Sequence, residues 1–453
     1  MSQGPHGRVV IISASVGAGH DGAAEQLAAR LTAAGITVDR HDLLDLLPAG
    51  LGRVVSGGYH RLLTYAPWTY QKIYAATERS GGSGPISRAV MRSAESRVLR
   101  AVPSDTRAVV STYPGAGQIL GALRRRGRLA APVVTYLTDF SVHPLWVASG
   151  VDHHLAAHAI PADQAEALGA ARVVVSGPVV GHRFTPAGPA QRQAARSRFG
   201  LPPAAPLALL VAGSWGVGPV SQVAEEIRDS GAAVPVVVCG HNQALADRLR
   251  AAGIEHAYGW VDDMPGLMHA SDVLVQNAGG LTSLEAFATG LPVASYRCIP
   301  GHGQTNAAAL HEAGVATWIR DPEDLKTVLA DLLEGPLGLR QRETALALFP
   351  SGPDSGPAAE IIRVCGQTAV PSDRADGPTP PPARLPRLTR RRTAARRLAV
   401  TATMAGAVWA GAVGTGIAAT HQGPVVMRTI HHTLDSDDGV SPPPASPSPE
   451  GSR

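Results

Sequence analysis

The sequence predicts an α/β protein with two Rossmann-like, parallel-sheet domains, followed by a linker, an apolar segment and a disordered tail. Short apolar runs rich in β-branched residues alternate with helical stretches over residues 8–345, and glycine-rich turns follow several of these runs. The composition changes to Pro, Gly and Ser after residue 345. A chain of 453 residues is long enough for two domains, which we place at 1–180 and 181–345.

Charge and cysteine content narrow the class of protein. The net charge of +4 arises largely from arginines at 384–397, outside both predicted domains. No nucleic-acid-binding motif accompanies them, so we expect no nucleic-acid partner. Cys239, Cys298 and Cys365 lack CxxC spacing, so we expect neither a disulfide nor a metal cluster. The residues before the first strand do not resemble a signal peptide, so we expect the two domains to be cytosolic.

The first strand, Arg8–Ser13, ends in a glycine-containing loop that reads ASVGAGH and closes with His20. A helix over Asp21–Ala34 follows it. The glycine spacing matches neither the dinucleotide fingerprint nor the Walker loop. On the residues alone, His20 either takes a proton from a hydroxyl substrate or caps the helix.

A later strand, Val133–Leu137, ends in the motif TDFSVHPLW, which contains Asp139, His143 and Trp146. Sheets of this class place ligands at the carboxyl ends of their strands, so we expect Asp139 to face a substrate. The alternative is that Asp139 caps the following turn. Another strand end, at residues 109–114, places Tyr113 in a loop of the same kind.

Residues 51–80 hold four of the eight tyrosines, Trp68 and several basic residues. Side chains with an apolar body and a polar tip suit the boundary between water and lipid. Aromatic packing between helices explains the segment equally well.

The most informative stretch is 270–306, where a strand, a Gly-Gly turn and a helix follow one another. Unpaired N–H groups and the positive end of a helix dipole favour a phosphate at this geometry. Glu285 lies about one turn into the helix, where it is placed for a ribose diol. The alternative is an ordinary crossover whose glycines only serve turns. The predicted elements are strand Asp272–Gln276, a helix opening at Leu281–Thr282, strand Leu291–Tyr296, the turn Pro300–Gly303 and a further helix.

The run GGLTSLEAFATGLPV…PGHGQTNA resembles the donor-binding signature of GT-B glycosyltransferases. It is most similar to the group of monogalactosyldiacylglycerol synthases and processive diacylglycerol glucosyltransferases, which is related to the lipid II-forming N-acetylglucosaminyltransferase. The likeness covers roughly residues 8–345. It implies a GT-B fold with a central cleft, in which the first domain binds the acceptor and the second binds the UDP-sugar.

The resemblance also implies roles for individual residues. His20 is the expected general base, and Asp139 is expected to orient it, to act as the base itself or to bind an acceptor hydroxyl. The expected acceptor-binding residues are Gly17, Gly19, Tyr113, His143, Trp146 and Trp68. The expected donor-binding residues are Gly213, Ser214, Gly216, Gly240, Asn242, Trp260, Val261, Gly279, Gly280, Leu281, Thr282, Glu285, His302, Gln304 and Asn306. Main-chain N–H groups at 213–218 and 279–281 are expected to face the diphosphate.

Two positions depart from the pattern of the resembled family. Many relatives carry His-Pro where this chain has Tyr113-Pro114. Relatives commonly read Pro-Gly-Gln-Glu, whereas His302-Gly303 stands at the Gln-Glu pair here. Those side chains usually bind the donor sugar, so the sugar stays open, with His302 or Gln304 as substitutes.

The tail predicts a membrane tether. Residues 346–397 form a Pro/Gly-rich and then basic linker, residues 398–420 carry no charge, and residues 421–453 have a disordered composition. A span needs about 20 residues, so 398–420 is long enough for a transmembrane helix. A surface-lying helix and a soluble low-complexity segment are the alternatives. Arginines before the segment and acidic residues after it place the enzyme on the cytoplasmic face.

These predictions combine into a hexosyltransferase that moves a sugar from a UDP-sugar to a membrane lipid such as diacylglycerol. We expect an inverting reaction with no metal and no cofactor beyond the UDP-sugar substrate, because no DxD motif lies near the sugar motifs. A UDP-sugar epimerase of the same fold and a non-catalytic, membrane-anchored nucleotide-sugar binding protein are the alternatives. The sequence leaves the oligomeric state open.

Overall fold

The computed structural model of the protein describes residues 7–16, 18–52, 72, 77, 85–350, 352 and 354–367. The predicted transmembrane segment 398–420, the arginine cluster, the tail 421–453 and most of the aromatic segment 51–80 lie outside these residues. Within the described part of the chain, no helix combines the length and apolar character that crossing a bilayer requires.

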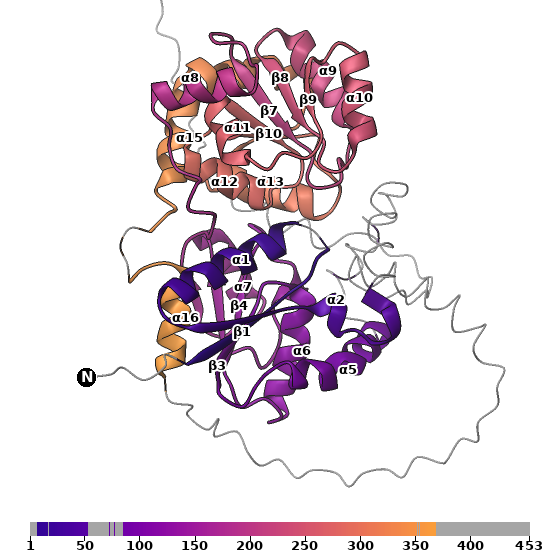
Figure 1. The fold of residues 1–453 in the computed structure, drawn as a ribbon, viewed down its shortest axis with the longest axis vertical. Coiled ribbons are helices and arrows are strands. Elements are labelled where there is room, and N and C mark those ends of the chain that lie inside the picture. Colours follow the sequence, from indigo (N-terminus) through magenta and orange to yellow (C-terminus); the bar gives the residue numbers. More distant parts are fainter. Residues whose placement is uncertain are drawn as a thin grey trace, which may run out of the picture. The chain divides into compact units, whose positions relative to one another are not determined.

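The first domain is built on a six-stranded parallel sheet with the order β2-β1-β3-β4-β5-β6. Strands β1, β3 and β4 are labelled in Figure 1. Its central strands are apolar on both faces, as expected of a parallel sheet covered by helices. The strands are β1 (Arg8–Ser13), β2 (Thr37–Asp42), β3 (Thr106–Ser111), β4 (Val133–Tyr136), β5 (His153–Ala156) and β6 (Val173–Val175). The described helices are α1 (Ala18–Ala33), α2 (Leu43–Leu46), α5 (Pro85–Arg100), α6 (Pro114–Arg125) and α7 (Ala159–Ala167), with 3-10 turns at Pro48–Gly50 and Pro144–Trp146.

The second domain repeats this architecture with a six-stranded parallel sheet of order β12-β11-β10-β7-β8-β9. Its strands are β7 (Leu207–Val211), β8 (Val234–Val238), β9 (His256–Tyr258), β10 (Val273–Gln276), β11 (Val293–Tyr296) and β12 (Thr317–Ile319). Its helices are α8 (Pro189–Arg198), α9 (Val220–Ser230), α10 (Gln243–Ala251), α11 (Met264–Ala270), α12 (Leu281–Thr289), α13 (His302–Glu312), α14 (Leu325–Glu334) and α15 (Pro336–Leu346), with a 3-10 turn at Pro322–Asp324. The prediction of two parallel-sheet α/β domains is therefore confirmed.

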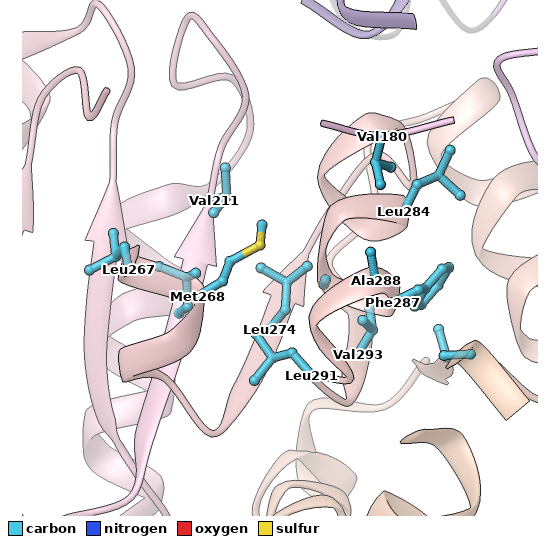
Figure 2. Packing of buried hydrophobic residues seen from close by; sticks show 14 of the residues in the cluster. Val180, Val211, Leu267, Met268, Leu274, Leu284, Phe287, Ala288, Leu291 and Val293 are labelled. Carbon is cyan, nitrogen blue, oxygen red and sulfur yellow. The ribbon is translucent and has the colours of Figure 1, made fainter. Parts of the chain in front are cut away.

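The largest buried cluster fixes α12, whose N-terminus the site uses (Figure 2). Phe287 and Leu284 of α12 pack with Leu274 of β10 and Val293 of β11. Val180, from the segment that connects the two domains, belongs to the same cluster. Full burial of a side chain such as Phe287 contributes about 1.5–3 kcal/mol. The helix that follows the Gly-Gly turn is thus held rigidly against its sheet.

The structure corrects one part of the predicted linker. Within 346–397, residues Pro357–Gly366 form helix α16, which packs on α1 and β3 of the first domain (Figure 1). Ile361 and Val364 are spaced three residues apart, and both are buried in the core of that domain. The Arg107 guanidinium also donates to the main-chain oxygen of Cys365 at 3.2 Å. The chain therefore returns to the first domain after completing the second.

Candidate active site

A cavity of about 820 Å³ is lined by residues of both domains at the carboxyl ends of their strands. Most of the residues predicted from the sequence line it. From the first domain these are Gly19, His20, Tyr113, Asp139, His143 and Trp146. From the second domain they are Gly213, Ser214, Gly240, Trp260, Val261, Gly279, Gly280, Leu281, Thr282, Glu285 and His302.

His20 lies in the first turn of α1, which begins three residues before the predicted start. Its Nδ1 is 3.0 Å from the main-chain oxygen of Thr112 and 3.0 Å from Oγ1 of Thr138. A carbonyl oxygen only accepts, so Nδ1 carries the proton and Nε2 keeps the lone pair. The rings of Tyr113 and Trp146 flank the imidazole, with centroids at 5.2 and 5.9 Å. Both hydrogen-bond partners lie outside α1, and the geometry suits a base rather than a helix cap.

Asp139 is held by the indole of Trp146. Nε1 of the buried Trp146 donates to Oδ2 of Asp139 at 3.0 Å. His20 is oriented by hydrogen bonds with the main-chain oxygen of Thr112 and the hydroxyl of Thr138, two residues to which the sequence analysis assigned no role. Both residues follow the ends of strands, and this position in the sequence could have identified them as candidates for the site.

His143 shapes the same wall through hydrogen bonds at both ring nitrogens. Nδ1 accepts from the N–H of Leu145 at 3.2 Å, and Nε2 lies 3.2 Å from Oγ1 of Thr77. Since Nδ1 accepts, Nε2 carries the proton and donates to the hydroxyl. This histidine caps the 3-10 turn that carries Trp146.

Asp21 supports the loop that leads to His20, a role missed in the sequence. Its two carboxylate oxygens accept hydrogen bonds from the hydroxyls of Ser13 and Ser15, at 2.5 and 2.6 Å. Ser15 lies in the loop and Ser13 ends β1, so the first turn of α1 is tied to the strand before it. The sequence pattern that could have indicated this role is an acidic residue directly after the histidine, together with serines at the end of the preceding strand.

On the donor side, two loops approach closely because glycine leaves room for them. Gly240 has φ +61°, and a Cβ there would lie 2.3 Å from the oxygen of Ser214. Only glycine combines this backbone conformation with such a contact. The loops after β7 and β8 therefore form one continuous wall of the cavity.

The helices α12 and α13 both present uncapped N-termini at this end of the sheet. Their N-cap residues, Gly280 and Gly301, have no side chain to accept from the first-turn N–H groups. Ser283, in the first turn of α12, is fully buried, and its Oγ has no hydrogen-bond partner in the described part of the chain. Uncapped N–H groups and a positive helix end favour an anion here.

One of the N–H groups expected to face the diphosphate is already used. Oε1 of the buried Gln276 accepts from the N–H of Ala278 at 2.7 Å and also from that of Gly279. This corrects the expectation for Gly279. The donors that remain on this turn begin at Gly280, at the start of the helix.

Burial perturbs two titratable groups in the cavity. It raises the pKa of the Glu285 carboxyl to about 8. For His302, burial lowers the pKa, the nearby Asp139 opposes that shift, and His20 adds to it. His302, from the second domain, lines the same cavity as the two candidate catalytic residues of the first.

Several predicted donor residues lie elsewhere. Gly216, Asn242 and Gln304 line a second cavity of about 1180 Å³ within the second domain, and Asn242 caps α10 by accepting from the N–H of Leu245 at 3.1 Å. Asn306 lines neither cavity. Gly17 and Trp68 lie outside the described residues. Of the two proposed substitutes for the Gln-Glu pair, only His302 therefore lines the first cavity.

Within the described ranges, no three His, Cys, Asp or Glu side chains gather as a potential metal site. Cys239, Cys298 and Cys365 are free thiols.

Two family models match the chain, one in each domain. Residues 20–180 match the monogalactosyldiacylglycerol (MGDG) synthase model, and residues 215–335 match the glycosyl transferases group 1 model. The first match holds His20, Asp139 and Trp146, and the second holds the Gly-Gly turn and His302.

Two bacterial proteins that are similar in sequence to this chain share the same name. The chain is 28% identical over 236 residues to a processive diacylglycerol beta-glucosyltransferase of Bacillus subtilis, covering 50% of this chain and 60% of that protein. It is 27% identical over 234 residues to the protein of the same name from Bacillus pumilus, with coverage of 50% and 60%. The chain thus spans about 60% of the length of these relatives.

A solved UDP-glucosyltransferase of Polygonum tinctorium, described as capable of glucosylating indoxyl, aligns with 81% of this chain and all of its own. The TM-score is 0.50 and the identity 14%, so this likeness shows the fold alone. Together these matches confirm the resemblance that the motifs indicate: the chain is similar to the monogalactosyldiacylglycerol synthase and processive diacylglycerol glucosyltransferase family of GT-B glycosyltransferases.

Proposed function

We propose that this protein transfers a hexose from a UDP-sugar to a hydroxyl group of a membrane lipid such as diacylglycerol. The observation that carries the proposal is the arrangement of His20, whose Nδ1 is fixed by the oxygen of Thr112 and whose ring lines the cavity. The relatives named above act on diacylglycerol by their names, which supports a lipid acceptor.

The reaction is a single inverting displacement. The acceptor hydroxyl oxygen attacks the anomeric carbon while Nε2 of His20 takes the hydroxyl proton. The bond between the anomeric carbon and the phosphate oxygen breaks with both electrons remaining on that oxygen, and UDP leaves. We assign binding of the acceptor hydroxyl to Asp139, which accepts from the indole of Trp146 and lines the same cavity.

The charge of the departing UDP is stabilised by the N-termini of α12 and α13, whose N–H groups have no side-chain cap. Preorganised dipoles of this kind stabilise the negative charge that a divalent cation stabilises in other transferases. We therefore propose that neither a metal nor a cofactor is needed. Transfer is expected to be unchanged after treatment with EDTA. Loss of transfer that magnesium or manganese restores would contradict this part of the proposal.

The nucleoside is expected along the second domain. Glu285 binds the ribose diol, and the main chain at Trp260–Val261 contacts the base. The indole of Trp260 stacks on the imidazole of His241, with centroids 4.2 Å apart and an interplanar angle of 3°, which braces this wall. We further propose that the enzyme acts at the cytoplasmic face of a membrane and is tethered through residues 398–420.

The test is transfer from labelled UDP-sugars to total membrane lipid, comparing the native protein with His20→Ala and with the control His256→Gln. His256 lies at the opposite end of the strands, against a different cavity. We expect one labelled lipid from the native protein and the control and none from His20→Ala. Conversion of the donor sugar without acceptor would indicate the epimerase. UDP binding without any product would indicate the binding protein.

A further inference from the structure

One buried side chain, Asn306, joins the two motifs that flank the cavity. Its Oδ1 accepts from the main-chain N–H of Ser141 at 2.8 Å, and its Nδ2 donates to the main-chain oxygen of Ala278 at 3.1 Å. Its exposed fraction is 0%. Both ends of the amide are therefore used inside the protein, and we refer to this pair of hydrogen bonds as the Asn306 bridge.

In the proposed function, the two partners of the bridge lie on different sides of the cavity, one on the donor side and one on the acceptor side. Ala278 lies in the turn between β10 and α12, directly before the Gly-Gly pair that lines the cavity on the donor side. Ser141 lies two residues after Asp139, in the loop of the acceptor wall. The bridge therefore spans 165 positions of sequence on one side and 28 on the other.

A second contact runs beside the bridge. Oγ of Ser141 donates to Oγ1 of Thr305 at 2.8 Å, and Thr305 Oγ1 lies 3.2 Å from the oxygen of His302. The loop after Asp139 is thus attached to the first turn of α13, whose first residue lines the cavity.

The packing leaves the amide a single orientation. Rotating it by 180° would place N–H against the N–H of Ser141 and oxygen against the oxygen of Ala278. Gly279 makes room for it, because a Cβ there would lie 2.8 Å from Cβ of Asn306. A displacement of the donor turn therefore either moves the acceptor loop or breaks a buried hydrogen bond.

We propose that Asn306 is a positioning residue that couples the donor turn to the loop carrying Asp139, so that binding of the UDP-sugar increases the affinity for the acceptor. The identity of the two ligands rests on the proposed function. The coupling itself does not, because it concerns two segments of the protein. It is reciprocal, so acceptor binding equally favours the donor.

The first experiment needs no catalysis. Hydrogen exchange of residues 138–146 is measured with and without UDP in the native protein, in Asn306→Ala and in the control His311→Gln, which changes an exposed residue of the same helix. We expect UDP to slow exchange of this segment in the native protein and the control. In Asn306→Ala, UDP still binds and the segment no longer responds. Absence of a response in the native protein overturns the proposal.

The second experiment separates coupling from direct contact with the donor. The acceptor KM is measured at low and at saturating UDP-sugar. We expect it to fall about fivefold or more in the native protein and to be independent of the donor in Asn306→Ala, with the donor KM at low acceptor concentration unchanged. A large rise of the donor KM with the coupling intact makes Asn306 a donor ligand and overturns the proposal.

Two further variants keep the result interpretable. Ser141→Ala removes only the contact with Thr305 and is expected to weaken the coupling without abolishing it. If Asn306→Ala does not fold, Asn306→Asp replaces it, because an oxygen still accepts from Ser141 while the donor to Ala278 is lost. If UDP does not bind the native protein, the proposed function fails at its donor. The bridge is then judged from exchange of the Ser141 N–H without ligand, and an unchanged rate in Asn306→Ala, which lacks the accepting oxygen, overturns it.

Discussion

Nδ1 of His20 lies 3.0 Å from the main-chain oxygen of Thr112, a residue 92 positions further along the chain. The bond joins the first turn of α1 to the end of β3 and decides which imidazole nitrogen is basic. Thr138, at the end of β4, adds its hydroxyl at the same nitrogen. Adjacent parallel strands bring these two residues together, because their carboxyl ends lie at the same edge of the sheet.

His20 and Thr138 are expected to affect transfer to different degrees. His20→Ala removes the base and is expected to lower kcat about 10²- to 10⁴-fold. Thr138→Val keeps the shape, loses one hydrogen bond worth about 1 kcal/mol and is expected to lower kcat about fivefold. The measurement is initial transfer rate at saturating substrates, with the UDP dissociation constant as the control for folding. Equal rates for His20→Ala and the native protein would remove His20 from the mechanism.

Glu285 is expected to make donor binding depend on pH. Burial raises its pKa to about 8, so the carboxyl is neutral in the free protein at lower pH. A carboxylate accepts from two ribose hydroxyls, so UDP binding favours the ionised form and releases a proton. The affinity for UDP should therefore rise with pH until about 8 and then level. Calorimetry in buffers of different ionisation enthalpy measures the released proton.

The variant Glu285→Gln separates this effect from other titrations. It is expected to bind UDP more weakly than the native protein and without the proton release. The same substitution should improve stability at high pH. Between the ordinary pKa of 4.5 and about 8, the folded protein holds a proton that the unfolded chain has lost, so unfolding becomes easier as pH rises. An identical pH slope of the urea midpoint in both proteins would contradict the assignment.

Buried histidines are expected to destabilise the protein in acid. Burial lowers the pKa of His153, His154, His158 and His302 below the ordinary 6.5. As pH falls through 6.5 and below, the unfolded chain binds protons that the folded protein does not bind, so the free energy of unfolding falls. Each group contributes at most about 1.4 kcal/mol per pH unit.

His154 offers the sharpest test of this effect, because it is buried and its Nε2 has no hydrogen-bond partner among the described residues. In His154→Gln, the denaturant midpoint should depend less on pH than in the native protein. Replacing the exposed His311 by Gln should leave the slope unchanged. Parallel curves for all three proteins would show that His154 does not contribute.

Gly303 is expected to reject the side chain that the resembled family carries there. A Cβ at this position would lie 2.7 Å from the main-chain oxygen of Asn277 and 2.6 Å from Cγ1 of Ile299. Gly303→Ala should therefore destabilise the protein by about 1–3 kcal/mol, and Gly303→Glu should not strengthen donor binding. Thermal unfolding and UDP-sugar titration measure both. A stable Gly303→Ala with native affinity would show that the turn relaxes freely.

The sequence by itself determined the class of fold and the position of the cleft. β1 and β10 match their predicted apolar runs closely, because the periodicity and β-branched content of a buried strand are local properties. The glycine turns and the residues beside them, such as His20 and Glu285, were also found, because strand ends and helix starts leave short local signals.

Only the tertiary structure decided which of these residues act together. Asn306 looked like a donor ligand by its motif, yet its amide joins Ala278 to Ser141 in the interior. Gln304, two positions before it, faces a different cavity, because successive positions on a helix point about 100° apart. Helix α16 could not be predicted from its linker-like composition, because its two buried side chains stabilise the helix only when they pack against the first domain. Contacts between segments far apart in sequence depend on how the sheets are assembled, and no local pattern encodes them.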